Sequence, residues 1–82
     1  MSVRRKALVV RARWDAETGT WWCANDTLPL ATEAPTFDGL CERVRAIAPE
    51  IAFENGLVQV GGEIELHFVA ERTQRAAVSS VA

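Results

Sequence analysis

The residues that could do chemistry in this chain are few: one histidine, two cysteines and eleven carboxylates. His67 has no Cys, Ser or second His near it in the sequence, so it lacks the partner that nucleophilic catalysis requires. No Ser-centred elbow, phosphate-binding glycine loop or paired-cysteine motif occurs. Cys23 and Cys41 show neither a disulfide framework nor a metal-ligand spacing, and their apolar neighbours predict small core residues. We therefore predict a protein that is not an enzyme, with no catalytic residue, metal ligand or cofactor.

Three tryptophans between positions 14 and 22 are the remaining unusual feature. A tryptophan can bury roughly 150–250 Å², so two of them can fill the core of a small domain. Trp21 and Trp22 are adjacent, however, and adjacent side chains of a strand point to opposite faces. An exposed tryptophan flanked by Arg11 and Arg13 has the composition of an interface hot spot. The pattern predicts a protein-binding surface.

A β-hairpin is expected to position these residues. In the segment Lys6–Trp14, apolar and polar positions alternate with period two, which is typical of a half-buried strand. Asp15–Thr20 has the composition of a turn, and Trp21–Asn25 is a short apolar run that returns as the second strand. If Trp14 lies opposite Trp21, then Trp21 and Cys23 face the core, and Trp22 points outward near Arg11 or Arg13. A one-residue slip would exchange the two tryptophans.

Two further strands are expected. Leu30–Glu33 predicts a short third strand at a sheet edge, where the nearby Pro29 does least harm. Glu63–Glu71 alternates most clearly, with Ile64, Leu66, Phe68 and Ala70 on one parity and Glu63, Glu65, His67 and Glu71 on the other. His67 is therefore expected on the polar surface of this strand.

One amphipathic helix is expected over the stretch Thr36–Gly56. Its apolar residues recur with helical spacing at Phe37, Leu40, Cys41, Val44, Ile47 and Ala48. Thr36 is a suitable N-cap, and Gly56 would end the helix. Pro49 removes one backbone donor and predicts a kink, or a restart that runs to Asn55.

The predicted fold class is α+β: a single small sheet in the order strand-strand-strand-helix-strand, with the helix packed on one face. A parallel last strand beside the first would place Glu63 and Glu65 next to Arg11 and Arg13. The same order invites a test for ribonuclease H chemistry, which needs carboxylates converging on metal ions, one of them in the middle of the first strand. That position is occupied by Val9, Val10 and Arg11. The sequence excludes this nuclease class.

Three segments resemble a small bacterial domain family of unassigned function that is related to HicB antitoxins. They are WWCANDTLPLATEAPT, AIAPEIAFENG and EIELHFVAER, and the resemblance covers about residues 6 to 72. The matching positions are Trp21, Pro29, Leu30, Thr32, Glu33, Ala34, Thr36, Pro49, Glu50, Asn55 and Gly56. The glycine expected between Pro29 and Leu30 is missing, and Gly39 stands where a helix-favouring acid is usual.

The resemblance implies a HicB-like, partial ribonuclease H fold. Relatives in the wider group bind and block a small RNA-cleaving toxin, and many carry a DNA-binding module after this domain. About ten residues follow Arg72 here, so we expect no DNA-binding module in the chain.

The length of 82 residues predicts one domain, with the HicB-like domain over residues 1–72 and a disordered tail over residues 73–82. No secretory signal or membrane-length apolar run is present, so a cytoplasmic protein is expected. Charge is uneven: five basic residues and no acid occupy the first thirteen positions, among them Arg4, Arg11 and Arg13.

Two hypotheses for function follow. The first is a non-catalytic, antitoxin-like protein-binding module that forms a homodimer or caps a small toxin-like partner through Arg11, Arg13, Trp22 and His67. The alternative is a single-stranded RNA-binding module in which Trp22 stacks on bases beside Arg11 and Arg13.

Overall fold

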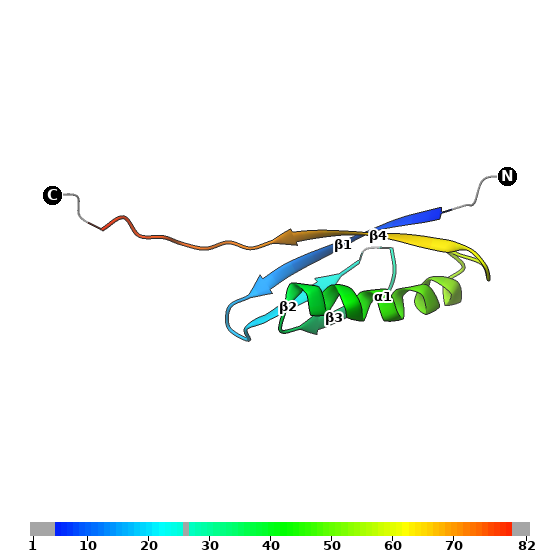
Figure 1. The fold of residues 1–82 in the computed structure, drawn as a ribbon, viewed down its shortest axis with the longest axis horizontal. Coiled ribbons are helices and arrows are strands. Elements are labelled where there is room, and N and C mark those ends of the chain that lie inside the picture. Colours follow the sequence, from blue (N-terminus) through cyan, green and yellow to red (C-terminus); the bar gives the residue numbers. More distant parts are fainter. Residues whose placement is uncertain (1–4, 26, 80–82) are drawn as a thin grey trace.

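The computed structural model describes residues 5–25 and 27–79, which form four strands and one helix (Figure 1). In chain order these are β1 (Arg5–Asp15), β2 (Thr20–Ala24), β3 (Ala31–Ala34), α1 (Phe37–Glu54) and β4 (Glu63–Glu71). The predicted α+β class and element order are confirmed. Residues 1–4, 26 and 80–82, which include Arg4 and the end of the predicted tail, lie outside the described part of the chain.

The four strands form one mixed sheet in the spatial order β3-β2-β1-β4. The pairs β1–β2 and β2–β3 are antiparallel, and β4 lies parallel to β1, the arrangement considered from the sequence. Trp14 lies opposite Trp21 in the hairpin, which confirms the predicted register. The turn is fixed by Asp15, whose carboxylate accepts the Glu17 N–H at 2.9 Å, and by Gly19 at φ +67°.

The register of β4 differs from the sequence prediction. Arg11 lies opposite Val69, and Arg13 lies opposite Glu71. The prediction that Glu63 and Glu65 would flank these arginines is therefore wrong. The two parallel strands begin level with each other, so the glutamates lie beside the first residues of β1 and the arginines lie near its end.

Helix α1 covers one face of the sheet. The Thr36 side chain accepts the Gly39 N–H at 3.0 Å, so this residue is the predicted N-cap. The buried stripe of the helix is Leu40, Val44, Ala48 and Ala52, each fully shielded from solvent. Ile47 was expected in this stripe but is 37% exposed. Four-residue steps drift by about 40° around a helix, so the stripe moves away from position 47 towards Ala52.

Pro49 does not divide the helix. α1 runs as one element from Phe37 to Glu54, with Asn55 as C-cap and Gly56 at φ +72°. Of the two predicted alternatives, the restart at Pro49 is wrong, and the kink stays a prediction. Pro49 and the residue four positions earlier, Arg45, are both exposed, so water can satisfy the carbonyl that loses its N–H partner.

The core lies between α1 and the inner face of the sheet. Its buried residues are Leu8, Val10, Ala12, Cys23, Leu28, Leu30, Ala34, Leu40, Val44, Ala48 and Ala52. An aromatic row extends this core: ring centroids are 5.7 Å apart for Trp14–Trp21, 5.4 Å for Trp21–Phe37 and 6.4 Å for Phe37–Phe68. These separations fall in the range favoured by tilted and edge-to-face aromatic pairs. The row therefore joins β1, β2 and β4 to the start of the helix.

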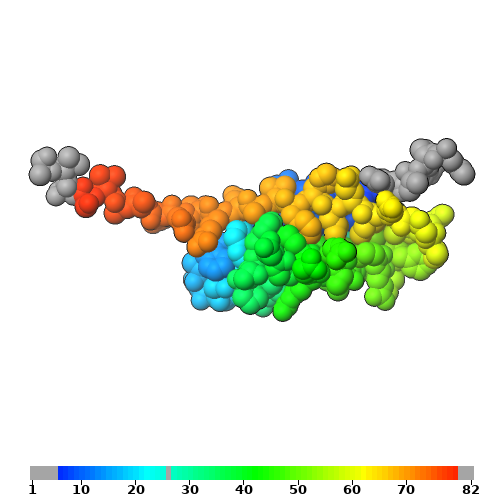
Figure 2. All heavy atoms as spheres, in the orientation of Figure 1, coloured from blue at the N-terminus to red at the C-terminus, as the bar shows by residue number. Residues whose placement is uncertain are grey.

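Residues 72–79 follow β4 as an extended segment that leads away from the domain (Figures 1 and 2). They form neither helix nor strand, and all of them are exposed. The disorder expected for residues 73–82 stays a prediction. In the described part of the chain, the helix is too short or too polar to cross a membrane.

Asn25 fastens the β2–β3 turn to β1. Its amide nitrogen donates to the Val9 carbonyl at 2.6 Å, and its side-chain oxygen accepts the N–H groups of Thr27 and Leu28 at 2.7 and 2.8 Å. Leu28 is thereby held with its side chain in the core. This side-chain bridge could not be predicted from the sequence.

We predict that Asn25→Ala lowers the free energy of unfolding by about 2–3 kcal/mol, because three hydrogen bonds of about 1 kcal/mol each are lost. Asn55→Ala is the matched control, since Asn55 makes one side-chain bond, to the Ile51 carbonyl at 2.8 Å. Urea unfolding of both variants measures the difference. Equal losses would show that Asn25 does not fasten the turn.

Candidate binding surface on the open face of the sheet

The face of the sheet opposite α1 carries mixed apolar and charged side chains. We call it the open face and define it by its exposed residues Val9, Arg11, Arg13, Trp22, Ala24, Glu33, Glu65, His67, Val69 and Glu71. These positions alternate along each strand with residues of the inner face, and none of them belongs to the buried core. The structure therefore brings all four predicted binding residues to one surface.

Trp22 lies at the centre of a row that crosses all four strands. Its register neighbours are Glu33 on β3 and Arg13 on β1, and Arg13 is paired in turn with Glu71 on β4. The Arg13 guanidinium carbon lies 5.8 Å from the Trp22 ring centroid, and its Nε lies 3.9 Å from Glu71 Oε2. Trp22 remains 39% exposed. The prediction that Trp22 faces outward beside an arginine is confirmed.

A second, less polar row of open-face residues lies next to the Trp22 row. Arg11 is flanked by Ala24 on β2 and Val69 on β4. Val69 is 46% exposed, and Val9, two positions before Arg11, is 48% exposed. Among the residues that the structure describes, Arg11 has no ion-pair partner. Apolar surface and one available cation thus lie beside the Trp22 row.

His67 lies one row further along β4, opposite Val9. Its Nε2 is 3.4 Å from Glu65 Oε2, two residues earlier on the same strand, and both side chains are about half exposed. The sequence prediction of a surface histidine between carboxylates is confirmed. Whether His67 contacts a partner stays a prediction.

The other side chains that could react or bind a metal are dispersed or buried. Within residues 5–25 and 27–79, no three His, Cys, Asp or Glu side chains lie close enough to hold a metal ion. Burial raises the pKa of the Cys23 thiol. Burial, and then the negative charge of Asp38, raises the pKa of the Cys41 thiol. A thiol with a raised pKa holds its proton at neutral pH and is a poor nucleophile.

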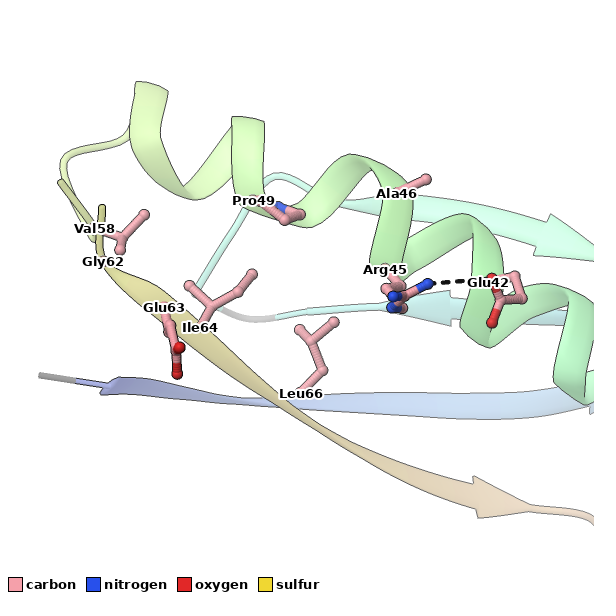
Figure 3. Close-up of a pocket in the computed structure, with 9 residues that line it drawn as sticks. All are labelled: Glu42, Arg45, Ala46, Pro49, Val58, Gly62, Glu63, Ile64 and Leu66. Atoms are coloured by element: carbon pink, nitrogen blue, oxygen red, sulfur yellow. Dashed lines mark ion pairs between the residues drawn. The ribbon is translucent and has the colours of Figure 1, made fainter. Parts of the chain in front are cut away.

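The structure also shows a groove on the helix side that the sequence did not reveal. It lies between α1 and β4 and has a volume of about 460 Å³. Its lining residues are Glu42, Arg45, Ala46, Pro49, Val58, Gly62, Glu63, Ile64 and Leu66 (Figure 3). Ile64 and Leu66 were predicted to face the core; they project towards the helix but stay only half-buried. Hydrophobic alternation indicates which face a residue is on but not whether a narrow helix covers it.

Comparison with known proteins places the chain in a family. The model of a domain of unknown function (DUF1902) matches residues 7–80. The chain belongs to the DUF1902 family. The expected small family of unassigned function is thus confirmed, whereas the HicB relationship stays a prediction from the sequence. No curated protein matches the sequence significantly.

A solved structure is similar to this DUF1902 domain over most of its length. It is the crystal structure of a hypothetical protein, TTHA1013, from the extremely thermophilic bacterium Thermus thermophilus. The two sequences are 34% identical, and the match covers 89% of this chain and 100% of the other, with a TM-score of 0.65. The similarity supports the fold described above.

We predict that neither cysteine is alkylated rapidly at neutral pH. Cys23 is 1% exposed, so iodoacetamide should modify it only when the domain unfolds. Cys41 is half-buried and should react slower than free cysteine but faster than Cys23, and its rate should rise only at alkaline pH because its thiol pKa is raised. Peptide mass spectrometry after timed labelling measures both rates. Reaction of either thiol at neutral pH as fast as free cysteine would indicate an activated nucleophile and contradict the prediction that neither cysteine is catalytic.

Proposed function

We propose that this DUF1902 domain is a non-catalytic, antitoxin-like binding module that engages a protein through its open face. The partner is a small toxin-like protein. The observation that carries the proposal is the half-exposed Trp22, with Arg13 stacked beside it and the apolar residues Val9 and Val69 on the same face. Tryptophan and arginine are the residue types most enriched at interface hot spots.

The geometry of the Trp22 row supports a protein partner. Arg13 is in contact with both Trp22 and Glu71, so the indole and its neighbouring cation are partly ordered before binding. Side chains that are already ordered lose less entropy when a complex forms. The surface combines apolar area with charges of both signs, which suits a protein surface of matching pattern.

The class of partner is supported by the resemblance to HicB antitoxins. Relatives in that wider group bind and block a small RNA-cleaving toxin, and the resembling segments include β2 with Trp22. A cytoplasmic site of action is part of the same proposal.

The test is purification of the tagged full chain from its native host, followed by identification of any small protein that binds it. Trp22→Ala should weaken that complex at least about thirtyfold, the effect of losing a hot spot worth about 2 kcal/mol. Phe53→Ala is the matched control, because Phe53 is an exposed aromatic residue on α1 and is 52% accessible. Calorimetric titration measures both affinities. A partner that binds wild type and Trp22→Ala equally, or the absence of any bound protein, would contradict the proposal.

Single-stranded RNA is the second candidate, favoured by Arg11, which has no ion-pair partner among the described residues. Acidic side chains at Glu33, Glu65 and Glu71 share the face and repel phosphate. We therefore expect a labelled oligonucleotide not to bind at micromolar protein in either low or high salt. Binding that weakens steeply as salt rises would favour the RNA hypothesis instead.

A further inference from the structure

Strand β4 is a long edge of the sheet. It has nine residues, contains no proline or lysine, and pairs with β1 along its whole length without a bulge; its charged side chains are Glu63, Glu65 and Glu71. In the described part of the chain, its other side has no neighbouring strand. Natural proteins usually shorten such edges or protect them with charged side chains, lysine above all, with proline or with bulges. The opposite edge, β3, has four residues and is flanked by Pro29 and Pro35.

The inner side of this edge is also incompletely covered. Ile64, Leu66 and Phe68 point to the helix side of the sheet, yet all three are only half-buried. Ile64 and Leu66 line the groove between β4 and α1 (Figure 3). A strand added beside β4 would therefore satisfy the backbone edge and cover apolar side chains.

We infer that the occupant of this edge is β4 of a second copy, paired antiparallel about a two-fold axis through Leu66. This self-association does not depend on the open face binding a partner, and either inference can fail alone. A two-fold axis perpendicular to the sheet makes the strands antiparallel and keeps both helices on one side.

The absence of like-charged pairs selects the register. With Leu66 opposite Leu66 of the second copy, each Glu65 lies opposite a His67, whose ring N–H can donate to the carboxylate, and each Ile64 lies opposite a Phe68. Aliphatic–aromatic contacts stabilise directly opposed pairs, and like charges destabilise them.

Neighbouring registers that keep both helices on one side each oppose like charges. An axis through Glu65 opposes Glu65 to itself, and an axis through His67 opposes Glu63 to Glu71. An axis through Phe68 opposes Glu65 to Glu71, and one through Ile64 opposes Glu63 to Glu65. Registers shifted by one residue place inward side chains against outward ones and put the helices on opposite sides.

The resulting dimer has one continuous sheet, in the order β3-β2-β1-β4 followed by its two-fold copy. Both open faces lie on the same side, and both helices lie on the other. The Glu65–His67 contact within one chain, 3.4 Å between Oε2 and Nε2, becomes part of a four-membered cluster across the axis.

The first test is the mass and register of the full chain in solution. Sedimentation equilibrium over a concentration series should give a dimer of about 18 kDa, twice the chain mass of 9.0 kDa. Leu66→Cys should form an intermolecular disulfide under mild oxidation, because its partner position lies directly opposite. Phe68→Cys is the matched control, since positions 68 of the two copies are four residues apart in this register. The wild-type chain controls for Cys23 and Cys41.

The second test changes the charges. His67→Glu should weaken the dimer about tenfold. Each Glu65 then lies opposite a glutamate of the other copy, so the dimer contains two such repulsive pairs. The exchange Glu65→His with His67→Glu should restore it. Trp22→Ala should leave the dimer intact, which separates this inference from the proposed function.

Three results would overturn the inference. A wild-type chain that stays at 9.0 kDa at all concentrations has no dimer. Equal crosslinking of Leu66→Cys and Phe68→Cys contradicts the register. A dimer unaffected by His67→Glu but lost in Trp22→Ala would place the interface on the open face.

Discussion

A single helix has to cover a four-stranded sheet in the described part of this chain. α1 places Leu40, Val44, Ala48 and Ala52 against the inner face, and these small and medium side chains are fully buried. One helix is about 10 Å wide, and neighbouring strands are about 4.8 Å apart, so it shields roughly two strands well. The opposite face is left open, and the inner side of β4 is left half-covered. Both candidate interaction surfaces, the open face and the β4 edge, exist because one helix is too narrow to cover the sheet.

The partition of the aromatic residues follows from strand alternation. Trp14, Trp21, Phe37 and Phe68 form the inner row that extends the core where the helix begins. Trp22 is adjacent to Trp21 on β2 and therefore cannot join that row. Its indole lies against Arg13 instead, which shields part of the ring but leaves 39% of the residue exposed. The domain therefore keeps a large aromatic side chain on its surface.

The sequence predicted the elements of this fold well because their signals are local. Alternation located β1 and β4, and Thr36 marked the start of α1. The register of Trp14 with Trp21 is one of the two that the sequence left open. Predictions that needed tertiary information were less successful. The stagger between β1 and β4 is set by how α1 and its loops span the sheet, so the partner of Arg13 is Glu71 and not Glu63 or Glu65. Ile47 is exposed because the buried stripe of α1 drifts away from position 47 as it runs from Leu40 to Ala52.

The central claim is that this domain acts by binding a protein through the open face. Hydroxyl-radical footprinting of the full chain, alone and with its isolated partner, tests that claim most directly. The account predicts that Trp22, Val9 and Val69 lose reactivity in the complex, whereas Phe53 on α1 stays as reactive as in the free chain. Protection of Phe53 with no change at Trp22 would contradict it.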